Sequence, residues 1–178
     1  MIRVLKAASA IAIAAAVVAT ATPVTAAPQA AKPKVVKVNV TFKGELSWES
    51  SDTLINVKSL KGTSAKKTDV FTSLTGTGRA AVPSSTCTAF AGDGVLKGKA
   101  GTITFSIGTG AQACGASDAA PAIVNADATA TVKKGTGIYK GATGTLKIKG
   151  NFMVQSVAAG TKETDKFTVT FTGDLKTK

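Results

Sequence analysis

The sequence predicts an all-β protein: a single antiparallel β-barrel of about eight strands, preceded by an N-terminal signal peptide. Three observations favour this fold class. Apolar and polar residues alternate along several segments, glycine-containing turns separate these segments, and no helical stripe of apolar residues follows residue 35. We favour a closed barrel over an open sandwich because closure removes exposed strand edges, which promote aggregation.

The first 26 residues have the pattern of a secretory signal peptide. Arg3 and Lys6 form the basic start, residues 7–21 are an alanine-rich apolar run of 15 residues, and residues 24–26 form a small-residue cleavage site. A transmembrane anchor is the alternative, but the run is shorter than the ~20 residues that a spanning helix needs. We therefore expect no transmembrane anchor and a protein that is secreted, periplasmic or associated with the cell envelope.

Residues 27–35 are rich in Pro, Ala and Lys and are expected to form a flexible tail. The predicted barrel domain then spans residues 36–178. In its first strand the apolar residues fall on even positions: Val36, Val38, Val40, Phe42, Leu46 and Trp48. Gly44 interrupts this pattern, which predicts either one unusually long strand or two strands joined by a kink.

The same alternation predicts the later strands. The clearest segments are 94–99, 102–107, 146–154 and 167–172, and the weaker ones are 53–60, 68–74, 77–82, 86–91 and 122–133. Turns are expected at positions 62–63, 76–78, 92–94, 108–110, 135–137 and 160. Asp93, Glu163 and Asp165 are interpreted as turn residues. Because the full chain has only nine aromatic residues, we expect alanine and glycine to fill a tapering interior.

Cys87 and Cys114 are predicted to form a disulfide, because an exported chain meets oxidising conditions. The alternative is a reactive or redox-active pair of thiols. The two residues are 27 positions apart and lack the Cys-x-x-Cys spacing that such a pair favours.

Composition excludes several classes of chemistry. With no histidine the chain cannot form a Ser-His-Asp or Cys-His catalytic unit or a histidine-ligated zinc site, and two cysteines cannot complete a four-cysteine site. We therefore expect no metal, no cofactor and no catalytic residue of these types.

The net charge of +12 falls to +10 without residues 1–26, which carry two positive charges and no negative ones. Nearly all of this excess is dispersed lysine, and Arg79 is the one arginine after residue 26. Since arginine is the residue that reads guanine edges, a specific nucleic-acid partner is not expected. The lysines either keep a strand-rich protein soluble or attract an anionic cell-envelope polymer or membrane surface.

The densest motif is the run Gly-Thr-Gly-Ile-Tyr-Lys-Gly-Ala-Thr-Gly over residues 135–144, which a predicted strand follows. It is not a nucleotide-binding loop, because Lys140 occupies the third-glycine place of G-x-G-x-x-G and no helix follows. Its glycines suit turn positions around a barrel-end plug formed by Tyr139 or Ile138. These glycines are Gly135, Gly137, Gly141 and Gly144.

This motif and the closing strand at 167–175 resemble small secreted bacterial proteins of unknown function and, more distantly, the allene oxide cyclase and dirigent barrels, over residues 92–175. The resemblance implies an eight-stranded antiparallel barrel, often a dimer or trimer. The plant relatives act as isomerases or stereochemical guides on apolar small molecules, but no catalytic residue carries over. A calycin-like barrel is a weaker comparison, because Gly44 and Trp48 lie four positions apart rather than in a Gly-x-Trp pattern.

Three functions are compatible with these features. The leading hypothesis is a non-enzymatic secreted barrel that binds a small apolar molecule or an envelope component. The second is an isomerase- or cyclase-like enzyme on an apolar substrate, and the third is a structural or adhesive surface protein. Candidate residues for a ligand pocket are the aromatic Trp48, Phe105, Tyr139 and Phe152. The alternative for Trp48 and Tyr139 is that they only fill the core or plug a barrel end.

Overall fold

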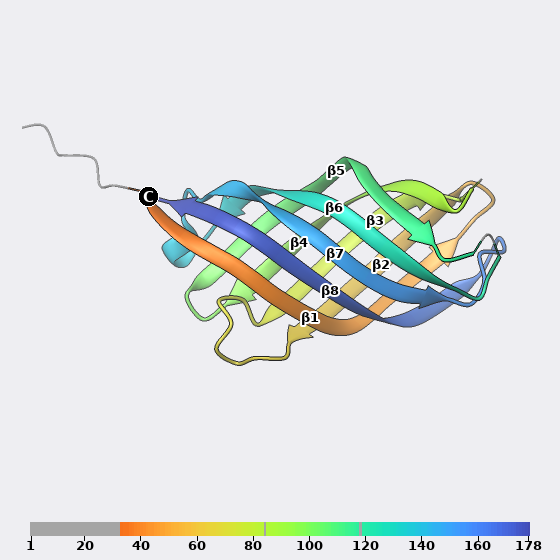
Figure 1. The fold of residues 1–178 in the computed structure, drawn as a ribbon, viewed down its shortest axis with the longest axis horizontal. Coiled ribbons are helices and arrows are strands. Elements are labelled where there is room, and N and C mark those ends of the chain that lie inside the picture. Colours follow the sequence, from red (N-terminus) through yellow and green to blue (C-terminus); the bar gives the residue numbers. More distant parts are fainter. Residues whose placement is uncertain (1–32, 84, 118) are drawn as a thin grey trace, which may run out of the picture. The chain divides into compact units, whose positions relative to one another are not determined.

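The computed structural model describes residues 33–83, 85–117 and 119–178, so the predicted signal peptide and residues 27–32 of the predicted tail lie outside it. The described chain forms a closed antiparallel barrel in which each strand pairs with the next and the last pairs with the first (Figure 1). The predicted fold class is therefore confirmed. Within the described ranges, no helix is long and apolar enough to cross a membrane.

The barrel is built from eight strands and a short 3₁₀ turn. The strands are β1 (Lys34–Ser50), β2 (Leu54–Ser64), β3 (Ser73–Ala81), β4 (Cys87–Gly98), β5 (Gly101–Gly115), β6 (Ala122–Gly135), β7 (Thr143–Val154) and β8 (Lys162–Thr177). The 3₁₀ turn η1 (Gly137–Tyr139) lies between β6 and β7.

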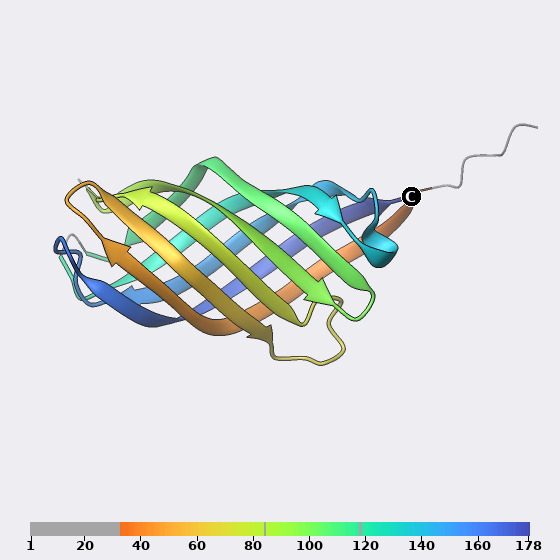
Figure 2. The same ribbon diagram turned by 180° about the vertical axis from the view of Figure 1, so that it is seen from behind.

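Because neighbouring strands run antiparallel, their connections alternate between the two ends of the barrel. The connections β1–β2, β3–β4, β5–β6 and β7–β8 lie at the open end, to the right in Figure 1. The connections β2–β3, β4–β5 and β6–β7 lie at the opposite end, together with Lys34 and the C-terminus. We call this the closed end because large side chains fill it; Figure 2 shows both ends from behind.

Most of the largest fully buried side chains lie in the half of the barrel next to the closed end: Val40, Phe42, Phe71, Leu96, Ile103, Tyr139, Leu146 and Leu175. Tyr139 of η1 packs on Phe71 of the β2–β3 connection, with the ring centroids 5.0 Å apart. Tyr139 is only 1% exposed, whereas its neighbour Ile138 is 57% exposed. Tyr139 is therefore the residue that plugs this end.

The glycine-rich motif forms the turn around Tyr139. Gly137 and Gly141 have φ angles of +60° and +71°, which favour glycine. A Cβ atom at Gly135 would overlap the carbonyl group of Tyr139, so this position also requires a residue without a side chain.

Four predicted turns are wrong, because their glycines lie inside strands: positions 62–63, 76–78, 92–94 and 108–110. In β3 and β4 the glycines face one another, Gly76 opposite Gly94 and Gly78 opposite Gly92. A Cβ atom at Gly76 would lie 2.9 Å from the carbonyl oxygen of Asp93, and one at Gly92 would lie 2.5 Å from that of Thr77. These glycines allow a close approach of two strands instead of ending them.

Other boundaries also differ from the sequence prediction. Positions 108–110 form an irregularity within β5, where the register with both neighbouring strands shifts. Most of the predicted strand at 68–74 is the β2–β3 connection. Asp93 lies within β4, and Glu163 and Asp165 lie within β8, so none of these three is a turn residue.

β1 is one continuous strand through Gly44, and it begins at Lys34. Lys34 and Val35 pair with β8, so the last two residues of the predicted tail belong to the barrel.

The predicted disulfide between Cys87 and Cys114 is present and joins β4 to β5 at the open end. Replacing both cysteines by serine should lower the free energy of unfolding by about 3.5 kcal/mol, because the bond closes a 27-residue loop in the unfolded chain. Urea unfolding monitored by circular dichroism measures this change. The wild-type protein unfolded with a reductant should match the double variant, and a loss well below 1 kcal/mol would contradict this account.

The plug at the closed end gives a second stability prediction. Tyr139→Ala should cost about 3–5 kcal/mol, as expected for removing a fully buried aromatic ring. Ile138→Ala is the matched control, and its effect should stay within about 0.5 kcal/mol because that side chain is exposed. Thermal and urea unfolding of the two variants provide the comparison, and equal losses would show that Tyr139 is not the plug.

Candidate functional site

A cavity of about 800 Å³ occupies the half of the barrel next to the open end. All eight strands contribute to its wall, as do residues of the β3–β4, β5–β6 and β7–β8 connections. The exposed residues Pro83, Ser85 and Ser117 form part of its mouth. Its volume lies within the range of about 300–1,000 Å³ that is usual for small-molecule sites.

The cavity exists because many inward positions in this half of the barrel carry small residues. These residues are Gly76, Gly78, Ala80, Gly92, Ala113, Gly115, Ala122, Ala126 and Gly150. Nearer the closed end the same strands carry larger residues such as Leu96, Ile103 and Leu146. The prediction that alanine and glycine fill a tapering interior holds only in part: alanines such as Ala128 and Ala130 belong to the packed core, but in the half next to the open end the small residues leave a cavity.

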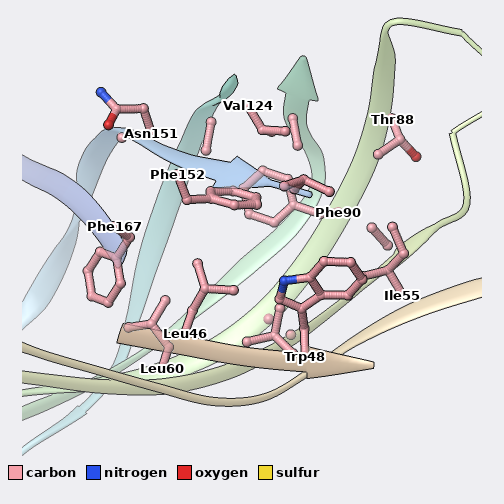
Figure 3. Close-up of a pocket in the computed structure, with 18 of the residues that line it drawn as sticks. Leu46, Trp48, Ile55, Leu60, Thr88, Phe90, Val124, Asn151, Phe152 and Phe167 are labelled. Carbon is pink, nitrogen blue, oxygen red and sulfur yellow. The ribbon is translucent and has the colours of Figure 1, made fainter. Parts of the chain in front are cut away.

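Aromatic side chains form the floor of the cavity and part of its wall. Phe105 and Phe171 pack with their ring centroids 5.4 Å apart, and Phe42 supports Phe171 from below at 5.9 Å. Closer to the mouth, the rings of Phe90 on β4 and Phe152 on β7 point into the cavity, as does the indole of Trp48 (Figure 3).

Three of the four aromatic residues that the sequence suggested for a pocket line this cavity: Trp48, Phe105 and Phe152. Tyr139 does not, because it plugs the closed end. Sequence reasoning missed Phe90, Phe167 and Phe171, which also line the cavity. The alternation within 167–172 placed Phe167 and Phe171 on one face of a strand, but it could not show which depth of the barrel they reach.

The indole of Trp48 is fixed by a carboxylate. Its Nε1–H donates a hydrogen bond of 2.7 Å to Oδ2 of Asp165 on β8. Burial raises the pKa of the Asp165 carboxyl above its usual value; the hydrogen bond from Trp48 lowers this pKa, and nearby Glu163 raises it further. Asp165 is not among the residues that line the cavity, but it is half-buried on the same face of β8 as Phe167 and holds the indole of Trp48 in place.

The polar groups at the mouth are mostly hydroxyls bonded to the backbone. Thr88 donates to the carbonyl of Ala81 at 3.1 Å, Ser85 to that of Cys87 at 3.0 Å, and Ser117 to that of Ala119 at 2.7 Å. These hydroxyl oxygens remain able to accept a hydrogen bond. In the described parts of the chain, no buried side-chain nitrogen or oxygen lacks a partner.

Charged side chains contribute little to the cavity wall. Arg79 and Asp93 border the cavity, but both are exposed and alternate with the inward-facing Gly78 and Gly92. The described residues also include no group of three or more potential metal ligands. The cavity therefore offers apolar contacts inside and neutral hydrogen-bond acceptors at its mouth.

No protein-family model, no curated protein and no solved structure matches this chain. The resemblance to the allene oxide cyclase and dirigent barrels, and the dimer or trimer that it implies, remain predictions from the sequence motif.

The contact between Trp48 and Asp165 predicts a pH-dependent fluorescence signal, since Trp48 is the one tryptophan of the chain. Because the pKa of Asp165 is raised in the folded protein, the protonated carboxyl favours the folded state. This contribution to the free energy of unfolding is lost as the pH rises from the pKa of Asp165 in the unfolded chain to its higher pKa in the folded protein. Trp48 emission should titrate with a midpoint above the usual pKa of an aspartate. Asp165→Asn should abolish this titration and Asp127→Asn should not; a titration that persists in Asp165→Asn would refute the assignment.

Proposed function

We propose that this protein is a secreted, non-enzymatic barrel that binds a small apolar molecule in the cavity at its open end. The observation that carries this proposal is the cavity of about 800 Å³, whose wall consists largely of aliphatic, aromatic and small residues. Apolar surface removed from water stabilises a complex by about 25 cal/mol per Å². Such a cavity is suited to an apolar ligand and offers little to a charged one.

The polarity of the wall narrows the class of ligand. The floor is aromatic and aliphatic, whereas Ser85, Thr88 and Ser117 place hydroxyl oxygens at the mouth. A neutral molecule with an apolar body and one polar group suits this arrangement, with the apolar body on the floor and the polar group at the mouth. A ligand with a buried charge would lack a partner of opposite charge and would pay a large desolvation cost.

Two features support export of the protein. The first 26 residues have the signal-peptide pattern, and the disulfide between Cys87 and Cys114 is of the kind that persists in oxidising compartments. The disulfide also ties two strands together at the mouth, where it limits the separation of β4 and β5.

An isomerase- or cyclase-like enzyme is the second candidate, and the raised pKa of Asp165 is the observation that favours it. A catalytic carboxyl group must reach its substrate, but Asp165 is not among the residues that line the cavity, and its Oδ2 accepts the hydrogen bond from Trp48. We therefore favour binding without catalysis. The third candidate, a structural or adhesive protein, would have no need of a cavity of this size.

Binding can be tested with the apolar fluorescent probe N-phenyl-1-naphthylamine. The wild-type protein should enhance its fluorescence, and Ala126→Phe should weaken binding at least about tenfold, because a ring at this inward position of β6 fills part of the cavity. Thr129→Phe is the matched control: it adds the same ring to the exposed face of the same strand and should leave binding unchanged.

Native mass spectrometry of the exported protein would identify a bound molecule directly. A wild-type protein that carries no small molecule and does not bind the probe would exclude both ligand-based candidates. If a recovered ligand is chemically converted by the wild-type protein but not by Asp165→Asn, the enzyme is correct and the non-enzymatic proposal fails.

A further inference from the structure

The lysines are concentrated at the closed end. We count as the closed end its connections, the C-terminus and the four residues of each strand that lie nearest to it. Within these limits there are twelve lysines: Lys34, Lys37, Lys61, Lys66, Lys67, Lys97, Lys99, Lys133, Lys134, Lys140, Lys176 and Lys178. All twelve are exposed. The described acidic residues within the same limits are Asp69 and Asp174. The sequence alone predicts dispersed lysines, because these residues come from five separate parts of the chain.

The open end differs in charge. Within the same limits its described basic residues are Arg79 and Lys162, whereas its acidic residues are Glu49, Asp52, Glu163 and Asp165. The barrel therefore has a strongly basic closed end and a weakly acidic open end.

Of the six exposed large apolar side chains in the described chain, two lie at the closed end and are the most exposed, and four lie at the open end. Ile138 is 57% exposed on η1, next to Lys140 in sequence, and Val35 is 52% exposed between Lys34 and Lys37. Neither side chain contributes to the core. Apolar side chains flanked by lysines are typical of surfaces that bind at the interface of a membrane.

We propose that the closed end docks on an anionic lipid surface, with lysines on the headgroups and the side chains of Ile138 and Val35 in the interfacial layer. The positive charge is complementary to such a surface, and each lysine close to it adds to the attraction. A soluble anionic polymer would account for the lysines but would leave the two exposed apolar side chains without a partner. This inference does not depend on the ligand of the cavity.

Docking at the closed end has a geometric consequence. The mouth lies at the opposite end of the barrel, so it faces the aqueous phase when the closed end is on the lipid. The protein would then be held at the membrane surface while its cavity stays open to molecules in solution.

The test is co-sedimentation of the exported protein with vesicles of phosphatidylcholine, with and without phosphatidylglycerol. We expect binding to the anionic vesicles alone. Changing Lys66, Lys67, Lys133 and Lys134 to glutamine should weaken it by on the order of a hundredfold or more. A matched control variant changes Lys43, Lys149, Lys162 and Lys166, which lie elsewhere on the barrel, to glutamine. It has the same net charge as the closed-end variant but should bind the anionic vesicles clearly more tightly.

Ile138→Ser separates lipid from polymer. It should weaken vesicle binding by about tenfold, because an apolar side chain no longer enters the interface, while leaving any binding to soluble polyphosphate unchanged. Equal losses of vesicle binding in the two lysine variants would overturn the proposal. So would polyphosphate binding as tight as vesicle binding, if Ile138→Ser has no effect on the vesicles. The third contrary result is a loss of vesicle binding when Leu54 and Met153 at the open end are changed to serine, while the closed-end lysine variant still binds.

Discussion

Closure of the sheet is the constraint on which the rest of the structure depends. β1 pairs with β8 along nearly its whole length, from Lys34 opposite Thr177 to Glu49 opposite Lys162, and this pairing completes the ring of strands. Once the ring is closed, its circumference fixes the interior space, and each inward position must either fill part of that space or leave it open. Side-chain size along the strands then determines where the barrel is solid and where it is hollow.

The two halves of the barrel are stabilised in different ways. Near the closed end, buried aromatic and aliphatic side chains pack against one another, with Tyr139 on Phe71 as the plug. Near the open end, small residues cannot supply such packing, and other interactions limit movement. The disulfide from Cys87 joins β4 to β5, and Asp165 holds the indole of Trp48 through a hydrogen bond between β8 and β1.

The fold could be predicted from the sequence because apolar and polar residues alternate with a period of two along each strand. This alternation gives every strand one face toward the barrel interior and one toward solvent. The cavity could be predicted only in part. Residue type identifies Trp48, Phe105 and Phe152, but it also selects Tyr139, because sequence spacing does not show at which depth a side chain enters the barrel. The sequence does not distinguish mid-strand glycines from turn glycines, because glycine serves both tight turns and the close approach of two strands. The gathering of lysines at one end depends on the topology and is not visible in the linear sequence.

The facing glycines of β3 and β4 (Gly76, Gly78, Gly92 and Gly94) form one wall of the barrel, and they limit how the size of the cavity can change in evolution. A side chain at Gly76 or Gly92 would meet a carbonyl group of the adjacent strand, so replacement there would disturb the sheet before it narrowed the cavity. Alanines such as Ala113 and Ala126 on β5 and β6 already have a Cβ atom and can be enlarged inward. Descendants of this barrel that accept smaller ligands should therefore differ at the alanines of one wall and retain the glycines of the other.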